Sequence, residues 1–340
     1  MADFDIFNPK ISRVAKGIEG KLVLVHSDER KLGKTLQATR MPKPFYLRFE
    51  QGINAISNVP YAELNNWSDF KKVNKQLTNP KTIEQARETY STIILDTCDV
   101  AIKWCEKYVC ATQGVTRLND GNSGYGLWKE MENEWFEEIT KLSNAGYCVY
   151  FISHSTPVKR IDPNTNEEYE QMSPKGDKRT IDLIVDLVDI IGYVKSNGID
   201  ENGDIIPSSI YFANTKEFQA GSRFTFMPRV LKEFTAENFQ EAIKKAIEME
   251  EKESGLKGLT FDEKLKQETF KVWTHEEILE EIKKYFVAMS KEYKDEVSDC
   301  IYKYINEDLK LSETTKKQLP QLEMVLYDLQ DLAKDKGIEV

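Results

Sequence analysis

One stretch near the N-terminus constrains the fold of this chain more than any other. An apolar run at residues 22–26 is followed by a loop that ends in Gly33-Lys34-Thr35. The run has the composition of a buried β-strand, and Leu36 and the residues after it favour a helix. A strand, a loop ending in Gly-Lys-Thr and a helix form the pattern of a phosphate-binding loop. An ordinary strand-turn-helix is the alternative interpretation.

A phosphate-binding loop works through its backbone and two side chains. Successive N–H groups curl around the β- and γ-phosphates of a nucleotide. We expect the ammonium of Lys34 to neutralise phosphate charge and the hydroxyl of Thr35 to ligate Mg²⁺. A nucleotide and Mg²⁺ are therefore the expected ligands of this loop. The expected binding segment comprises Asp28, Glu29, Arg30, Lys31, Leu32, Gly33, Lys34, Thr35 and Leu36.

The loop departs from the usual G-x-x-x-x-G-K-[ST] pattern, because Asp28 holds the position of the first glycine. Aspartate tolerates left-handed backbone geometry better than most residues, so the turn can still form. The carboxylates of Asp28 and Glu29 place negative charge near a polyphosphate, and Arg30 and Lys31 are expected to offset it. We expect nucleotide binding to survive this departure; full hydrolysis is the property it puts in question.

Composition bounds the class of protein. The 340 residues are 40% hydrophobic, enough for one large α/β domain and a smaller appendage. The net charge is −10, so any binding to nucleic acid has to come from local basic segments. No apolar run approaches the roughly 20 residues of a membrane span, and the first five residues lack the features of a secretory signal. We expect a cytoplasmic protein with no membrane partner.

Short apolar runs alternate with amphipathic segments after the loop, which predicts a mostly parallel sheet covered by helices on both faces. The predicted strands are 22–26, 45–49, 92–96, 147–153 and 188–194, and the predicted helices are 34–40, 67–76, 98–111, 127–144 and 178–186. A turn cluster at 198–204 indicates a terminal β-hairpin; a calcium loop is the alternative, but its ligand spacing is wrong.

The chain is expected to divide into three parts. Residues 1–252 form the α/β domain, 253–261 a linker and 262–340 a small all-helical C-terminal module. Binding a partner, driving oligomerisation and simply stabilising the chain all remain open as roles for that module.

Polar residues close three of the predicted strands. Asp96 follows the apolar run 92–95 and is expected to hold Mg²⁺ through a water; capping the next helix is the alternative. If the strand ending near Glu50 lies beside the phosphate-loop strand, Glu50 reaches the γ-phosphate as a general base. Ser153 and His154 end another strand and are candidate γ-phosphate sensors, although a lone histidine is usually structural.

In this order, the motifs resemble those of the RecA-like P-loop ATPases. The resemblance is strongest to the phage-encoded AAA-type nucleotide-binding proteins associated with single-strand annealing and recombination. It covers about residues 18–250, and Gly124-Tyr125-Gly126, 187–193 and 220–223 are also similar to the phage group. It implies that the nucleotide is ATP, that Glu50 activates water and that His154 couples the γ-phosphate to a DNA-binding loop at 156–178. It also implies a host-cytoplasmic location if the chain is phage-encoded.

That implied loop carries basic residues that would track single-stranded DNA. Acidic residues in the same loop favour the alternative, a merely solvated loop. Residues 113–125 form a second, weaker candidate. The expected DNA-binding residues are Lys159, Arg160, Lys175, Lys178 and Arg179, with Arg117 in the second segment.

The resemblance further implies a homo-oligomer, a ring or a filament, whose active sites form between subunits. Lys216 and Arg223 stand where a basic finger would enter a neighbour's γ-phosphate site; surface charges are the alternative. A single-strand-binding or annealing protein is a further implied partner. The resulting hypothesis is a DNA-stimulated ATPase. A nucleotide-dependent scaffold with little hydrolysis is the main alternative, and a small-molecule P-loop kinase is a third.

Overall fold

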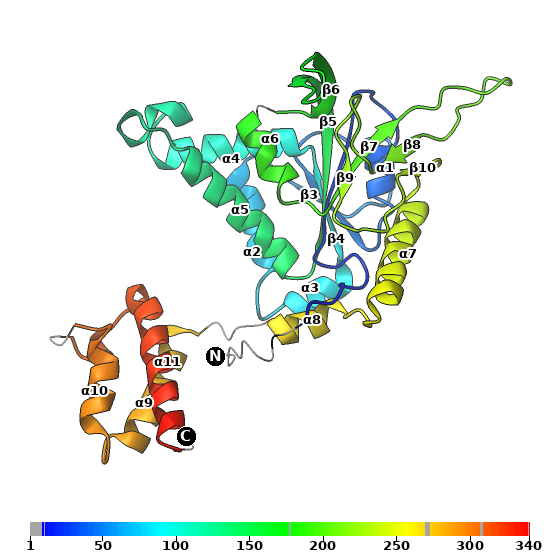
Figure 1. The fold of residues 1–340 in the computed structure, drawn as a ribbon. Helices are drawn as coiled ribbons and strands as arrows, with labels where there is room; N and C mark the ends of the chain where they lie inside the picture. The colour runs from blue at the N-terminus through cyan, green and yellow to red at the C-terminus, as the bar shows by residue number, and fades with distance from the viewer. Residues whose placement is uncertain (1–8, 10, 177, 269–272, 307–308, 339) are drawn as a thin grey trace. The chain divides into compact units, whose positions relative to one another are not determined.

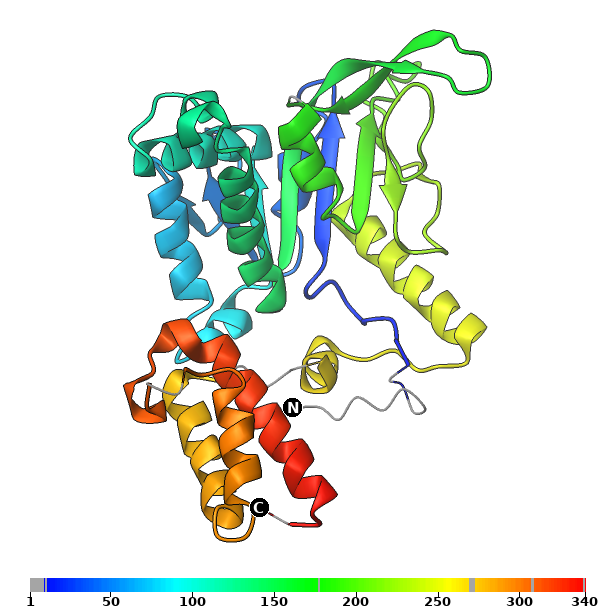
Figure 2. The same ribbon diagram turned by 60° about the vertical axis from the view of Figure 1, so that its left-hand side comes forward.

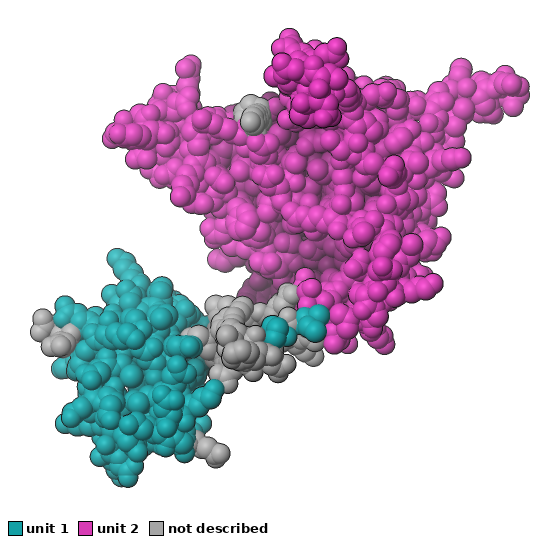
Figure 3. Space-filling view, viewed as in Figure 1, with its two compact units in different colours: residues 1–11, 265–340 teal, residues 12–264 magenta. Residues whose placement is uncertain are grey.

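A computed structural model describes residues 9, 11–176, 178–268, 273–306, 309–338 and 340. The chain forms two compact units, coloured separately in Figure 3. The larger unit comprises residues 12–264 and carries every residue of the predicted nucleotide site. The smaller unit comprises residues 1–11 and 265–340.

The larger unit alternates strands with helices along most of its length. Its strands are β1 (Leu22–Ser27), β2 (Pro44–Arg48), β3 (Tyr61–Glu63), β4 (Thr92–Asp96), β5 (Cys148–Ile161), β6 (Glu168–Pro174), β7 (Ile190–Lys195), β8 (Ser209–Tyr211), β9 (Gly221–Ser222) and β10 (Val230–Leu231). Its helices are α1 (Lys34–Ala38), α2 (Trp67–Leu77), α3 (Ile83–Thr89), α4 (Cys98–Thr112), α5 (Trp128–Asn144), α6 (Lys178–Val185) and α7 (Ala236–Ser254), with short 3₁₀ turns η1 (Leu118–Asp120) and η2 (Asn122–Gly124); α8 (Phe261–Glu268) follows α7.

The strands form one sheet in the order β10-β8-β7-β1-β5-β4-β2-β3. Six neighbouring strands, from β7 to β3, are parallel, and β8, β9 and β10 add antiparallel pairings at one side. The predicted parallel sheet and its terminal hairpin, β7–β8, are confirmed. Since β1 lies between β5 and β7, the phosphate loop leaves the middle of the sheet, where parallel-sheet proteins place their ligands.

Helices cover both faces of the sheet (Figures 1 and 2). On one face, α2, α4, α5 and α6 pack over a core that includes the stacked indoles of Trp67 and Trp135, whose ring centroids are 5.5 Å apart. On the other face, α1 and α7 pack over a second core around Phe239. The apolar stripe of α5 belongs to the first of these cores: Met131, Trp135, Ile139 and Leu142 are buried, and Trp128 is half-buried.

The prediction of a loop at 156–178 is wrong for most of its length. β5 continues without a break from the parallel sheet into an antiparallel hairpin with β6, pairing Ser155 with Pro174 through Ile161 with Glu168. The hairpin projects past the carboxyl ends of the sheet strands (Figure 2). Both of its faces are largely polar, so its sequence lacks the apolar alternation that marks a strand with one buried face.

The smaller unit is helical, as predicted. It contains α9 (His275–Met289), α10 (Lys294–Tyr302) and α11 (Leu319–Asp335), with 3₁₀ turns η3 (Leu311–Glu313) and η4 (Lys316–Gln318). Thr274 begins α9 with a capping box, in which its hydroxyl accepts from the N–H of Glu277 and the carboxylate of Glu277 accepts from the N–H of Thr274. The three helices enclose their own apolar core, which includes Ile278 and Leu326. Among the described residues, no helix is long and apolar enough to cross a membrane.

Candidate nucleotide-binding site

The phosphate loop, residues 28–35, connects β1 to α1 at the carboxyl end of the sheet. Lys31 and Gly33 have left-handed backbone angles, with φ of 64° and 84°, and glycine reaches this region without the steric cost of a Cβ. The hydroxyl of Ser27, the last residue of β1, donates to the carbonyl of Glu29 at 2.6 Å and accepts a hydrogen bond from Nζ of Lys34. The loop therefore folds back on the end of β1 and holds Lys34 there.

Lys34 is a buried cation, 9% exposed, whose ammonium contacts only neutral acceptors: the hydroxyl of Ser27 and, at 3.4 Å, the carbonyl of Glu29. No carboxylate in the described part of the chain forms an ion pair with it. Burial lowers the pKa of Lys34, although the charges of nearby acidic residues oppose the shift. A buried cation is costly without a counter-ion, and a phosphate group would supply one.

Asp96 closes β4 within reach of the phosphate loop. The hydroxyl of Thr35 donates to its Oδ2 at 2.7 Å, and the hydroxyl of Tyr46 donates to the same oxygen at 3.0 Å. Burial raises the pKa of Asp96, and these two hydrogen bonds limit the rise. The N-cap of α4 is Thr97, so the carboxylate of Asp96 turns toward the phosphate loop and does not cap that helix. The structure thus brings together Thr35 and Asp96, the two predicted metal-site residues.

Glu50 reaches the same edge of the sheet by a route that the sequence did not predict. The expectation that its strand lies beside the phosphate-loop strand is wrong, because β5 and β4 separate β2 from β1. The backbone N–H of Glu50 instead donates to the carbonyl of Asp96 at 3.2 Å. Burial and the negative charge of Asp96 raise the pKa of Glu50. A raised pKa makes a carboxylate a stronger base, which suits it to accept a proton from water.

The end of β5 adds a third group of polar side chains. The hydroxyl of Ser153 donates to the carbonyl of His154 at 2.8 Å and is buried. Nδ1 of His154 lies 3.7 Å from Oδ1 of Asp99, and Nζ of Lys175 lies 3.6 Å from the other carboxylate oxygen. Burial alone would raise the pKa of Asp99, but His154, its neighbour Thr97 and Lys175 together lower it. His154 is therefore held beside a charged carboxylate.

Three residues of this site escaped prediction. Tyr46 lies inside the apolar run of β2, and Asp99 lies in the first turn of α4. Tyr193, whose hydroxyl donates to Oδ1 of Asp28 in the phosphate loop, lies inside the apolar run of β7. A tyrosine in a buried strand has the same sequence pattern as a core aromatic, so the run itself carried no signal. Asp99 comes three residues after the strand-ending Asp96, and this spacing was a signal that could have been used.

Two of the basic residues expected to bind DNA lie on the β5–β6 hairpin. Lys159 is exposed, and its Nζ lies 3.7 Å from a carboxylate oxygen of Glu168 on the opposite strand. Nε of Arg160 is buried and, among the described residues, has no hydrogen-bond partner. Both residues belong to β5, the same strand that carries His154 at the site.

The other expected DNA-binding residues are spread over separate elements. Lys175 follows β6 and pairs with Asp99. The guanidinium of Arg179, in α6, stacks 4.8 Å from the ring centroid of Trp128. Arg117 is exposed just before η1, and the side chain of Lys178 lies outside the described residues. The described members of the predicted set therefore lie on several separate elements of the fold.

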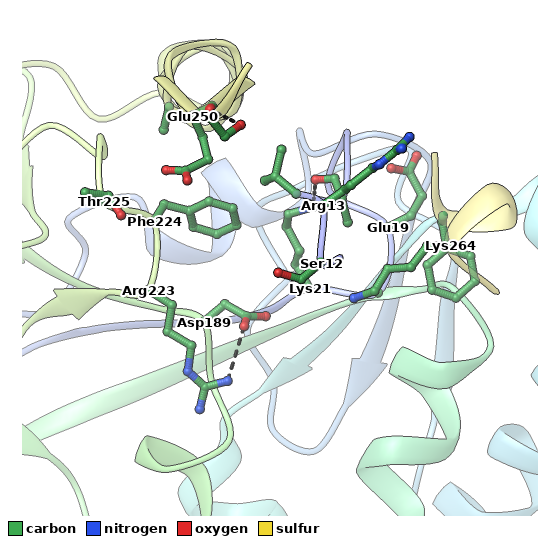
Figure 4. A pocket seen from close by; sticks show the side chains of 16 residues that line it. Ser12, Arg13, Glu19, Lys21, Asp189, Arg223, Phe224, Thr225, Glu250 and Lys264 are labelled. Atoms are coloured by element: carbon green, nitrogen blue, oxygen red, sulfur yellow. Dashed lines mark hydrogen bonds and ion pairs between the residues drawn. The ribbon is translucent and has the colours of Figure 1, made fainter. Parts of the chain in front are cut away.

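Lys216 and Arg223, the expected finger residues, are far from each other in the fold. Lys216 forms an ion pair with Asp162 at the end of the hairpin. Arg223 lies 3.3 Å from Asp189 (Figure 4). The carboxylate of Asp189 also accepts from the N–H of Leu22 at the start of β1. Arg223 is thus at the amino edge of the sheet, opposite this chain's own phosphate loop, where it lines a cavity of about 450 Å³.

Comparison with known proteins agrees with this geometry. The family described as AAA domain matches residues 25–224, which run from within β1 to just past β9 and include every polar strand end described above. The chain belongs to the AAA domain family. Its AAA domain has the predicted RecA-like P-loop fold, a mostly parallel sheet with helices on both faces and the phosphate loop after the central strand.

The chain is also similar to a prophage protein. The SPbeta prophage-derived uncharacterized protein YorG of Bacillus subtilis strain 168 is 42% identical over 329 residues, which cover 96% of this chain and 98% of that protein. The similarity extends beyond the AAA domain through the helical C-terminal residues. The predicted relationship to phage AAA-type P-loop proteins is confirmed.

The residues of the AAA domain fit a magnesium nucleotide. A hydroxyl and a carboxylate, 2.7 Å apart at Thr35 and Asp96, belong to the oxygen class that Mg²⁺ prefers, and Mg²⁺ usually completes its shell with water and phosphate oxygens. The ammonium of Lys34, which forms no ion pair within the described residues, lies at the same loop. AAA domains are in general nucleotide-binding ATPase domains, and this site has the donor set such a domain needs.

Proposed function

We propose that this protein binds and hydrolyses Mg-ATP and uses the cycle to act on single-stranded DNA in phage recombination, annealing or replication. The observation that carries the proposal is the pairing of Thr35 with Asp96 at the loop that holds the buried ammonium of Lys34. Membership of the AAA domain family supports the nucleotide part of it.

The chain's own groups divide the work of hydrolysis. Lys34 binds the phosphates and offsets their charge, while Thr35 and Asp96 hold the metal ion, which when bound neutralises charge on the phosphate oxygens. Glu50 orients the attacking water and accepts its proton. Its position supports this role, since it is fixed by a backbone hydrogen bond to Asp96 and its pKa is raised by burial.

His154 and the hairpin connect this site to DNA in our proposal. His154 occupies the point where β5 leaves the parallel sheet and enters its pairing with β6. A change at the γ-phosphate that moves His154 would act directly on the strand bearing Lys159 and Arg160. Those two cations would contact the phosphate backbone of the single strand.

We also propose that the protein works as a homo-oligomer. Arg223 projects from the amino edge of the sheet with its side chain 59% exposed, so it is accessible to a second copy. Lys216, 64% exposed, offers an alternative cation near the hairpin. Either residue would supply positive charge to a neighbouring site only in the assembled state.

ATP hydrolysis by the purified protein, with and without single-stranded DNA, tests the first part. Lys34→Ala should lose nucleotide binding because it removes the cation, whereas Lys244→Ala, an exposed change on α7 outside the site, should keep it. Glu50→Gln should retain binding and lose turnover by at least about a hundredfold, in the range of a general base. Full turnover in Glu50→Gln would refute the base assignment.

DNA binding is tested by reversing charge on the hairpin. The double substitution Lys159→Glu and Arg160→Glu should weaken affinity for single-stranded DNA and reduce the salt slope by roughly one per lost phosphate contact. Lys244→Glu, an exposed change on α7, is the matched control. Equal affinity of the hairpin variant and the control would exclude the hairpin as the DNA contact.

A nucleotide-dependent scaffold with little hydrolysis is a second candidate. The observation that favours it is the carboxylate of Asp28 at the first position of the phosphate loop, where a glycine is usual. Tight, Lys34-dependent nucleotide binding without turnover, in the presence or absence of DNA, would support this candidate over the ATPase.

A further inference from the structure

The side chain of Asp28 is held by a strand outside the phosphate loop. The hydroxyl of Tyr193, in β7, donates to Oδ1 of Asp28 at 2.5 Å. Tyr193 lies opposite His26 in the parallel register of β7 with β1, so it stands beside the point where the loop begins. Asp28 and Tyr193 thus join the first residue of the phosphate loop to the neighbouring strand.

Tyr193 is itself fixed on both sides. Its ring stacks on Phe218, with centroids 4.3 Å apart and planes 8° apart, and meets the ring of His26 edge-on at 5.2 Å. Only 4% of Tyr193 is exposed. A side chain packed in this way cannot follow a mobile loop, so the hydrogen bond constrains Asp28 and not Tyr193.

His26 adds a second restraint behind the ring. Its Nε2 donates to the carbonyl of Gln219 at 2.7 Å, because a carbonyl can only accept, and Nδ1 then accepts from the hydroxyl of Ser155 at 2.8 Å. His26, which packs against the ring of Tyr193, therefore links β1 to β5 and to the segment before β9.

We propose that Tyr193 is a positioning residue for nucleotide binding, which holds the carboxylate of Asp28 against β7 and away from the phosphates. This inference rests on the proposed nucleotide site and explains how the loop works without its usual first glycine. An unrestrained carboxylate at this position would face the polyphosphate and oppose it electrostatically. With the hydrogen bond from Tyr193 in place, the side chain of Asp28 instead fixes the start of the phosphate loop to β7.

The hydroxyl of Tyr193 is suited to remain the donor. Burial and the hydrogen bond to Asp28 both raise the pKa of this phenol, so it keeps its proton throughout the pH range in which the protein would be assayed. Hydrogen bonds to a carboxylate are stronger than those between neutral groups.

The test is a double-mutant cycle read by the Kd of a fluorescent ATP analogue and by steady-state kinetics. Tyr193→Phe should weaken binding about tenfold, as expected for loss of a charge-assisted hydrogen bond, and raise KM while changing kcat less than about twofold. In the Asp28→Gly background the same substitution should change the Kd less than about twofold, because no carboxylate is left to restrain. Tyr211→Phe is the matched control: its ring also lies against Phe218, and no hydrogen bond of its hydroxyl is found among the described residues.

The outcomes separate this inference from the proposed function. Unchanged affinity in Tyr193→Phe, or an equal loss in the wild-type and Asp28→Gly backgrounds, would overturn the positioning role while leaving the site intact. Nucleotide affinity that does not respond to Lys34→Ala would overturn the proposed site and the positioning role with it.

Discussion

Protonation of His26 should contribute to the acid sensitivity of the larger unit. The imidazole is fully buried, with Nε2 donating to one carbonyl and Nδ1 accepting from a hydroxyl. Burial lowers the pKa of His26 from 6.5 to about 4. The unfolded chain therefore binds a proton on this residue at a higher pH than the folded chain does. The stability that the neutral ring contributes is fully present above pH 6.5 and is lost as the pH falls toward 4.

The size of this effect follows from the two pKa values. Between pH 7.5 and pH 5, the unfolded state binds most of one proton at His26, whereas the folded state stays unprotonated there. The free energy of unfolding therefore falls by about 2 kcal/mol. The full loss below pH 4 is about 3 kcal/mol, from roughly 2.5 pKa units at 1.36 kcal/mol each. His26→Gln removes the titration while keeping a polar group between Ser155 and Gln219.

The assay is urea unfolding at pH 7.5 and pH 5, followed by far-ultraviolet circular dichroism for wild type and His26→Gln. The difference in unfolding free energy between the two proteins should shift by about 2 kcal/mol across that interval, with wild type losing more. A difference that stays constant with pH would refute the account of His26 as a buried neutral histidine.

Two further perturbations follow from the structure. A Cβ on Gly52 would meet Oδ2 of Asp96 at 2.7 Å and displace this proposed metal ligand. Gly52→Ala should therefore reduce Mg-dependent ATP turnover at least tenfold. Gly221→Ala is the control and should leave the rate unchanged, because a Cβ there meets nothing within 4 Å. Thr274→Ala removes the capping box of α9 and should destabilise the helical unit by about 1 kcal/mol in thermal unfolding, without changing nucleotide affinity.

The core of the fold was predictable because its strands are short apolar runs with polar ends. The apolar run that ends at Asp96 became β4 with its bounds unchanged, and α2 and α4 each ended one residue later than predicted. β3, β9 and β10 were not predicted. They have three, two and two residues, too few to show any period, and pairing with longer strands is what creates them.

The polar strand ends of the site could be predicted from the sequence, but the contacts between them could not. Lys34, Thr35 and Asp96 come from a known pattern, and the structure joins them. The strand before Glu50 was expected beside β1, but β5 and β4 lie between them. Strand order depends on how each helix crosses over between strands, which no local sequence pattern encodes. The roles of Tyr46 and Tyr193 depend on contacts with residues 50 and 165 positions away, at Asp96 and Asp28, which periodicity cannot reveal.

The central place of β1 in the sheet has a consequence for synthesis of the chain. β1 ends at Ser27, but its two neighbours begin only at Cys148 and Ile190. At 5–20 residues per second, the ribosome needs roughly 6–24 s to add the 120 residues between Ser27 and Cys148. During that time β2, β3 and β4 can already pair, whereas the apolar strand that carries the phosphate loop has both edges open. The nascent chain must therefore keep this apolar strand from misassociating until β5 and β7 have been translated.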